Sequence, residues 1–126
     1  ELNSAKDKTS SNSGMMLNLA LSYGSRQEII NAMKLIYIHC NENRYDINSI
    51  TEEEVSANLY TSDISDPDLL IRTGGDYRLS NFLLWQIAYT ELIISKKYWP
   101  DFSKSDFISS IKEFQLRERR FGRLSN

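Results

Sequence analysis

The chain has very few of the residues that build disulfides and metal clusters. It contains one cysteine, Cys40, and one histidine, His39. A single cysteine excludes a disulfide within the chain, which fits a reducing, cytoplasmic environment. Cys40 falls at helical spacing from other apolar residues, so it is expected to be a small buried hydrophobe. His39 has no second histidine or suitably spaced carboxylate beside it, and this argues against a zinc or catalytic-histidine site.

A long apolar run and an excess of positive charge are also missing. No apolar stretch is long enough to cross a bilayer, and a composition of 40% hydrophobic and 25% charged residues is typical of a globular protein. The formal net charge of -2 argues against general nucleic-acid binding, because such surfaces are strongly basic. Any site for an anion must therefore be local, and no nucleic-acid partner is expected.

The most informative stretch runs from residue 66 to 86. Its apolar run Leu69-Leu70-Ile71 lies between Pro67 and Gly74-Gly75, which predicts a buried parallel strand ending in a loop. Arg72, Arg78 and Ser80 follow at once. A strand end, a glycine loop and two guanidinium groups together favour a site for an anion.

Ser80 also precedes the apolar run Phe82-Leu83-Leu84-Trp85, as a helix N-cap would. A helix N-terminus would add to the anion site. A simpler interpretation fits the same residues equally well: the arginines pair with Asp68 or Asp76, and Ser80 only caps a helix.

The remaining segments predict an α/β fold, with a parallel sheet flanked by helices. Strands are expected over residues 17–23, 68–73 and 90–95, and helices over about 26–40, 51–59, 82–86 and 103–121. In the first of these helices, Ile29, Met33, Ile36 and Cys40 are expected to face the core. Residues 1–14 show no apolar period and are expected to form a connecting loop.

Two helices carry capping-box signatures. Thr51 with Glu54 predicts the N-terminus of one helix, and Ser103 with Asp106 predicts the N-terminus of the other. In this second helix Phe107, Ile111 and Phe114 would form the buried stripe. The acids at 52–54 complement the positive end of a helix better than they form a metal cluster.

The order of these motifs resembles the cis-prenyltransferase family, whose bacterial members are undecaprenyl diphosphate synthases. The resemblance is carried by the stretch from Leu70 to Gln86, by Ala88-Tyr-Thr-Glu-Leu92, by Trp99-Pro-Asp-Phe102, by the segment from Leu17 to Arg26 and by Arg117-Glu-Arg-Arg-Phe-Gly122. It implies that residues 1–126 form the C-terminal part of one such domain. The family's opening Asp-Gly-Asn-Gly-Arg motif, with its catalytic aspartate, does not occur in the chain, so the chain alone is expected to be inactive.

The resemblance also implies an activity: condensation of isopentenyl diphosphate with an allylic diphosphate such as farnesyl diphosphate, giving a long-chain polyprenyl diphosphate. Arg72, Arg78 and Ser80 would bind isopentenyl diphosphate, and Arg120 would complete the diphosphate site of a neighbouring subunit in a homodimer. Glu91 would bind Mg²⁺. The enzyme would be cytoplasmic, with a peripheral membrane contact through its lipid product.

Three positions depart from the family pattern. Ser25 replaces the second glycine of the usual Tyr-Gly-Gly-Arg turn, Asp76 replaces a glutamate, and Tyr77 replaces a histidine found in several bacterial members. A tyrosine with an ordinary pKa near 10 is a poorer base than histidine. Two other interpretations remain open: a non-catalytic subunit with this fold that supports a partner enzyme, and a phosphate-binding module without chemistry. Without the resemblance, Glu91 would be expected to pair with Lys96 or Lys97.

Overall fold

Two short parallel strands form the sheet that positions the candidate site. The computed structural model describes residues 1–42 and 46–118. In it β1 (Leu69–Arg72) pairs with β2 (Glu91–Ile94), with Leu69 beside Glu91 and Arg72 beside Ile94. These strands confirm two of the three predicted ones, and Ile93 of β2 is buried. Because the strands are parallel, Glu91 lies at the end of the sheet where the strands begin, and Arg72 lies where they end.

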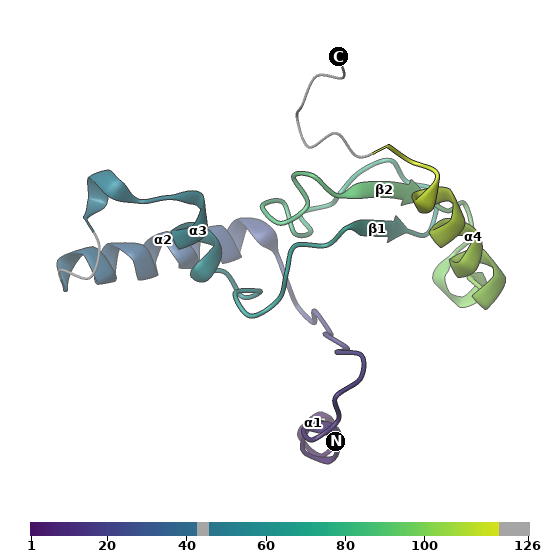
Figure 1. Cartoon of the computed structure of the whole chain (residues 1–126), viewed down its shortest axis with the longest axis horizontal. Helices are drawn as coiled ribbons and strands as arrows, with labels where there is room; N and C mark the ends of the chain where they lie inside the picture. The colour runs from purple at the N-terminus through teal and green to yellow at the C-terminus, as the bar shows by residue number, and fades with distance from the viewer. Residues whose placement is uncertain (43–45, 119–126) are drawn as a thin grey trace.

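Helices lie at both ends of an elongated molecule (Figure 1). The helices α2 (Ser25–Asn41) and α3 (Glu52–Ala57) pack together at one end, while α4 (Lys104–Gln115) packs against β2 at the other. Single 3-10 turns, η1 (Ile47–Ser49) and η2 (Trp99–Asp101), precede α3 and α4. The expected α/β class with a parallel sheet and flanking helices is confirmed. None of the helices in residues 1–42 and 46–118 is long and apolar enough to cross a membrane.

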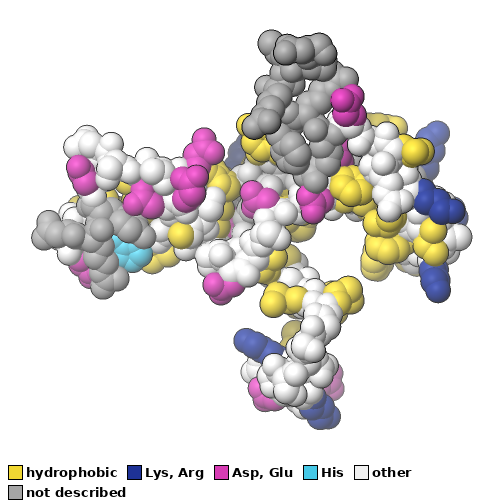
Figure 2. Space-filling view, in the orientation of Figure 1, with side chains coloured by type: hydrophobic (Ala, Val, Ile, Leu, Met, Phe, Trp, Pro, Cys, Tyr) yellow, Lys and Arg dark blue, Asp and Glu magenta, His cyan; other side chains and the backbone are white. Residues whose placement is uncertain are grey.

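The third predicted strand, over residues 17–23, is wrong. No strand is formed there, and Leu17, Leu19 and Leu21 are 74%, 56% and 68% exposed. A strand needs a neighbour to accept and donate its backbone hydrogen bonds. Among the described residues β1 and β2 pair only with each other, so the alternating pattern has no partner. Figure 2 shows apolar side chains along this connection between α1 and α2.

The N-terminal segment is helical where a loop was predicted. The helix α1 (Leu2–Thr9) forms without burying any of its residues. Its sequence lacks an apolar stripe, which explains why none of its residues is buried in the described part of the chain. Local hydrogen bonds from the Thr9 hydroxyl to the carbonyl oxygens of Ala5 and Lys6 help to close its last turn.

The helix α2 forms as predicted, and its predicted apolar stripe is only partly buried: Ile36 is buried and Ile29 is half-buried. Glu28, Ala32 and Ile36 are buried, with Ser25, whereas Met33 is 65% exposed. Cys40 is half-buried. The buried face therefore combines Ile36 of the predicted stripe with the small or polar residues Ser25, Glu28 and Ala32, and Met33 lies in solvent.

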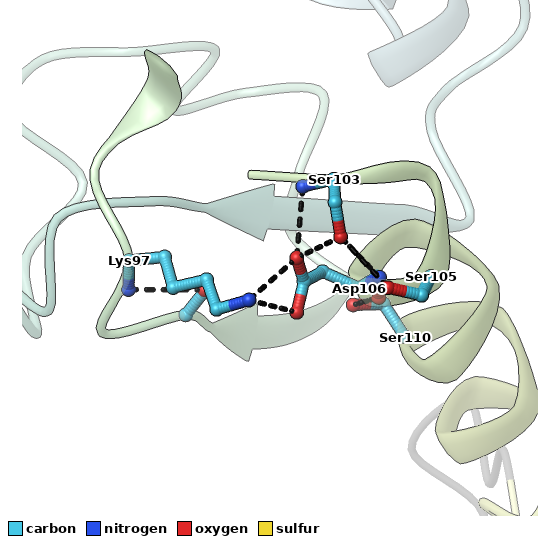
Figure 3. Close-up of polar contacts among 6 residues, drawn as sticks. Lys97, Ser103, Ser105, Asp106 and Ser110 are labelled. Carbon is cyan, nitrogen blue, oxygen red and sulfur yellow. Dashed lines mark hydrogen bonds and ion pairs between the residues drawn. The ribbon is translucent and has the colours of Figure 1, made fainter. Parts of the chain in front are cut away.

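Both predicted capping boxes are present. In α3 the Glu54 amide donates to Thr51 Oγ1 at 3.3 Å, and the Thr51 amide donates to Glu54 Oε2 at 2.7 Å. In α4 the Ser103 amide donates to Asp106 Oδ2 at 2.8 Å, and Lys97 Nζ lies 2.9 Å from the same carboxylate (Figure 3). Lys97 therefore ties the segment after β2 to the start of α4.

The buried stripe of α4 is only partly as expected. Ile111 and Phe114 are half-buried, but Phe107 is 50% exposed and Ser110 is the buried residue. The Ser110 hydroxyl donates to the Asp106 carbonyl oxygen at 3.0 Å, so it is satisfied within the helix.

The predicted helix over 82–86 is also wrong. A turn segment spans residues 80–89, in which Ser80, Asn81 and Leu83 have φ of 50°, 63° and 46°. These left-handed conformations cannot belong to a right-handed helix, and Ser80 lacks the extended backbone of an N-cap. We call residues 80–89 the crossover turn, because it takes the place of a crossover helix between β1 and β2.

Candidate functional site

A glycine turn ends β1 and directs the chain toward the candidate site. Gly74 and Gly75 have φ of 92° and 77°, which residues with a Cβ adopt at a cost. Their amides donate to the carbonyl oxygens of Lys97 at 2.8 Å and Ser95 at 2.9 Å. The turn is thereby fixed to the segment that follows β2, and the polar residues after it fold back over the end of β1.

Arg72 is the centre of the site. From the last position of β1, its Nη1 donates to Ser80 Oγ at 3.2 Å and to the Arg78 carbonyl oxygen, and its Nη2 lies 3.4 Å from Asp76 Oδ2. Its side chain is 23% exposed. Arg72 Nε is buried and has no acceptor in the part of the chain that the structure describes. Buried N–H groups are nearly always paired, so an acceptor from outside the described residues is expected beside this donor.

Arg78 reaches the same carboxylate from the solvent side. Its Nη2 lies 2.5 Å from Asp76 Oδ2, and its side chain is 66% exposed. The structure thus brings Arg72, Arg78 and Ser80 together, as the sequence predicted, and it also shows the expected pairing with Asp76. Two guanidinium groups share one carboxylate, which leaves one positive charge uncompensated within this cluster.

Glu91 lies at the other end of the sheet, where β2 begins. Its Oε2 accepts from Arg117 Nη1 at 2.8 Å, and the same nitrogen donates to the Leu92 carbonyl oxygen at 3.1 Å. Glu113 Oε1 accepts from Arg117 Nη2 at 2.6 Å. The hydrogen bond to Glu91 has the largest effect on the pKa of Arg117 and raises it above its usual range. The hydrogen bond to Glu113 raises it further.

The expected lysine partners of Glu91 are therefore wrong, because Arg117 takes that place and Lys97 pairs with Asp106. Across residues 1–42 and 46–118 no three His, Cys, Asp or Glu side chains gather in a way that would hold a metal ion. The residues present do not by themselves fit a magnesium site, since Mg²⁺ needs several oxygen ligands and Glu91 is already bonded to a cation. Arg120, the fourth predicted substrate-binding residue, lies outside the described residues.

The sequence analysis missed a buried polar network beside the crossover turn. Glu28 and Ser25 are completely buried in the first turns of α2, and Gln86 of the crossover turn is 3% exposed. Gln86 Nε2 lies 3.2 Å from Glu28 Oε2 and 2.9 Å from Thr61 Oγ1. The signal was the 3-4-4 spacing of Ser25, Glu28, Ala32 and Ile36, which a search for apolar residues passes over.

Ser25 has ordinary helical backbone, so a glycine is not needed there, and its side chain bonds the crossover turn. It is the first residue of α2 and is not among the residues with positive φ. Its Oγ accepts from the Leu84 amide at 2.9 Å. Gly24 is the position without spare room, because an added Cβ would lie 3.0 Å from Asn81 Nδ2.

Burial raises the pKa of Tyr23, and the hydrogen bond that its hydroxyl donates to Glu28 raises it further. The Tyr23 ring also meets Phe82 edge to face, with centroids 5.6 Å apart. These contacts pack the crossover turn against the first turns of α2 and the turn that precedes α2.

The chain is similar in sequence to proteins of one known family. The chain matches, over residues 1–122, the family model described as putative undecaprenyl diphosphate synthase. An isoprenyl transferase of Clostridium acetobutylicum is 53% identical over 124 residues, covering 96% of this chain and 48% of that protein. An isoprenyl transferase of Oceanobacillus iheyensis is 49% identical over 118 residues, covering 94% and 47%. The chain spans about half the length of the curated relatives it matches.

Two solved structures have the same fold over nearly the whole chain. Lavandulyl diphosphate synthase from Lavandula x intermedia, in complex with dimethylallyl diphosphate, superposes with a TM-score of 0.91 at 34% identity, over 95% of this chain and 52% of that one. A probable undecaprenyl diphosphate synthase from Campylobacter jejuni gives 0.80 at 39% identity, over 97% and 54%. The chain therefore belongs to the undecaprenyl diphosphate synthase family of cis-prenyltransferases.

Proposed function

We propose that this chain supplies the isopentenyl diphosphate site of a cis-prenyl chain-elongating enzyme. The observation that carries the proposal is Arg72, whose buried Nε has no acceptor among the described residues while its other nitrogens are fixed by Ser80, Arg78 and Asp76. A guanidinium held in one orientation with a donor to spare suits the many acceptor oxygens of a diphosphate. Arg78 adds a second, more exposed cation to the same place.

In the proposed reaction, isopentenyl diphosphate attacks C1 of an allylic diphosphate such as farnesyl diphosphate. The new carbon–carbon bond forms as the C1–O bond to the allylic diphosphate breaks, and loss of a proton leaves a cis double bond. Repetition gives a long-chain polyprenyl diphosphate such as undecaprenyl diphosphate. The role of Arg72, Arg78 and Ser80 is to bind and orient the nucleophile's diphosphate, which turns the encounter of two substrates into a reaction within one complex.

Binding of Mg²⁺ by Glu91 would require a change in the present contacts of its carboxylate. The family resemblance implies Glu91 as a metal ligand, but its carboxylate is bonded to Arg117. Binding an ion there requires that ion pair to open and requires further oxygen ligands from outside the described residues.

The test uses the full-length protein that contains this chain. Incubated with farnesyl diphosphate and radiolabelled isopentenyl diphosphate, it is expected to form labelled polyprenyl products. Arg72→Ala is expected to raise the KM for isopentenyl diphosphate, at a cost of about 2 to 4 kcal/mol for a lost charge-assisted contact. Lys112→Ala, which removes an exposed cation from α4, is the matched control and should change nothing. Absence of labelled product from the unmodified protein would favour a non-catalytic subunit and overturn the proposal.

A further inference from the structure

Glu28 is a completely buried carboxylate that binding of the substrate does not explain. Its Oε1 accepts from the Tyr60 amide at 2.9 Å and from Gln86 Nε2 at 3.3 Å. Its Oε2 accepts from Gln86 Nε2 at 3.2 Å and from the Tyr23 hydroxyl. Each of these partners is a neutral donor. Burying a carboxylate without a cation is costly, so these donors must be held firmly for the arrangement to persist.

The donors come from three separate segments of the chain. Tyr23 lies in the turn before α2, Tyr60 follows α3, and Gln86 belongs to the crossover turn. Gln86 Nε2 also donates to Thr61 Oγ1 at 2.9 Å, which adds a second tie between the crossover turn and the segment after α3. Glu28 is thus the common acceptor through which these segments are joined.

The first turn of α2 also holds the other end of the crossover turn. The Ser25 amide donates to the Asn81 carbonyl oxygen and the Arg26 amide donates to Asn81 Oδ1, both at 2.9 Å. Asn81 thereby satisfies two of the amides that a helix N-terminus leaves unpaired. It directly follows Ser80, the residue whose hydroxyl accepts from Arg72.

The crossover turn needs such support because its backbone is strained. Ser80, Asn81 and Leu83 all have positive φ, a conformation that residues other than glycine adopt at an energetic cost. Strained conformations persist only where the surrounding structure fixes them. Here α2 fixes them at both ends, through Asn81 near the arginines and through Gln86 at Glu28.

We propose that Glu28 is a positioning residue for isopentenyl diphosphate binding. Through Gln86 it holds the crossover turn in its strained form, and the turn in turn keeps the Ser80 hydroxyl and the Arg78 carbonyl oxygen where they orient the Arg72 guanidinium. Glu28 touches neither substrate. This inference rests on the proposed function and adds to it a residue that lies outside the arginine cluster.

The experiment compares two variants of the full-length enzyme. Glu28→Gln keeps the size of the side chain but offers an amide nitrogen where the neighbouring groups donate. We expect the KM for isopentenyl diphosphate to rise about fivefold to tenfold, as for the loss of one ordinary hydrogen bond among the contacts that orient Arg72. The KM for the allylic diphosphate is expected to stay the same, because the contacts from Glu28 through Gln86 and the crossover turn lead to Ser80 and the arginine cluster.

Ile36→Val is the matched control. Ile36 lies on the same buried face of α2, two turns beyond Glu28, and is 7% exposed. Its truncation lowers stability by leaving a small cavity, without touching the network. Both variants should melt at lower temperature, but only Glu28→Gln should change the KM for isopentenyl diphosphate.

A second variant keeps the inference testable if Glu28→Gln does not fold. Gln86→Met removes the donor on the crossover turn and leaves the carboxylate with Tyr23 and Tyr60. It is expected to raise the same KM in the same direction. Unchanged KM values in a folded, active variant of either kind would overturn the inference and leave the proposed function standing. An unmodified enzyme that neither binds nor incorporates isopentenyl diphosphate would overturn both.

Discussion

The shared carboxylate of Asp76 makes the two arginines of the site unequal. Arg72 bonds three groups at once, Asp76, Ser80 and the Arg78 carbonyl oxygen, whereas Arg78 has Asp76 as its acceptor and is 66% exposed. Fixing a guanidinium in advance removes part of the entropy cost of binding a ligand. Arg72 should therefore contribute orientation as well as charge, and Arg78 mainly charge.

Lysine substitution separates orientation from charge. Arg72→Lys keeps the charge but cannot reproduce the planar fork that meets several acceptors, so we expect the KM for isopentenyl diphosphate to rise by the equivalent of about 1 to 3 kcal/mol. Arg78→Lys should cost clearly less, because an exposed cation acts largely as a point charge. Steady-state kinetics of the full-length enzyme measures both. Equal losses in the two lysine variants would contradict the unequal roles.

Glu91 and Arg117 form a pair whose two members are predicted to behave differently. Either Glu91→Gln or Arg117→Gln breaks the 2.8 Å ion pair, and each is expected to lower stability by about 1 kcal/mol. If Glu91 is also a metal ligand, only Glu91→Gln should raise the Mg²⁺ concentration needed for half-maximal activity. Magnesium titrations of both variants, alongside urea unfolding, measure the difference. An identical magnesium dependence in the two variants would remove Glu91 from the metal site.

At the scale of elements, α4 depends on a carboxylate at its N-terminus. Lys97 and the Ser103 side chain and amide hold the pKa of Asp106 well below its usual value. A carboxyl group with a lowered pKa in the folded state stabilises that state above its ordinary pKa, and this contribution is lost as pH falls through the folded value. The cap should therefore be complete at neutral pH and weaken only in acid.

Asp106→Asn tests this cap. The variant should be less stable than the unmodified protein at pH 7, because the bonds from Lys97 and Ser103 to a charged acceptor are gone. The difference between the two proteins should shrink as pH falls below about 4, where the carboxylate of the unfolded chain becomes protonated. Urea unfolding at a series of pH values gives both curves. A difference that stays constant down to strongly acidic pH would show that the charge of Asp106 is not what stabilises α4.

Local signals were the part of the fold that could be predicted. The capping boxes at Thr51 and Ser103 depend on residues three apart, and the apolar runs around Ile71 and Ile93 mark strands by themselves. The strand expected over 17–23 could not be judged in this way, because a strand exists only with a hydrogen-bonded neighbour. An alternating pattern states which face would be buried, but not that a partner is present.

The candidate site also contains some residues that could be predicted from local sequence and others that depend on distant contacts. Arg72, Arg78 and Ser80 could be grouped from the sequence because they lie close together along the chain. The crossover turn could not be predicted, since the positive φ values at Ser80 and Asn81 depend on bonds from α2, more than fifty residues away in sequence. Glu28 was missed for the same reason: its burial is decided by contacts across the fold and not by its neighbours along the helix.

At the scale of the whole molecule, the chain spans about half the length of the relatives it matches. We propose that the complete enzyme is a homodimer in which Arg120, outside the described residues, acts at the neighbouring subunit's diphosphate site. A twofold axis would place each C-terminal tail at the partner's site by symmetry. A diphosphate is a target that offsets the cost of desolvating a guanidinium.

Mixing two inactive full-length variants, Arg78→Ala and Arg120→Ala, tests this arrangement. In a mixed dimer one site has both arginines intact and the other has neither, so activity should partly return after subunit exchange. Product formation is measured before and after exchange, with heterodimer formation checked by two different affinity tags. No recovery in proven heterodimers would exclude action of Arg120 across the interface.

The proposed function depends on the binding of isopentenyl diphosphate by the arginine cluster at the end of β1. Isothermal titration calorimetry of the full-length protein with this ligand, in the absence of the allylic substrate, measures that binding. We expect measurable binding that Arg72→Ala weakens about thirtyfold or more, a loss of about 2 kcal/mol or more, while Lys112→Ala binds as the unmodified protein does. Equal affinity in Arg72→Ala and the unmodified protein would contradict the claim.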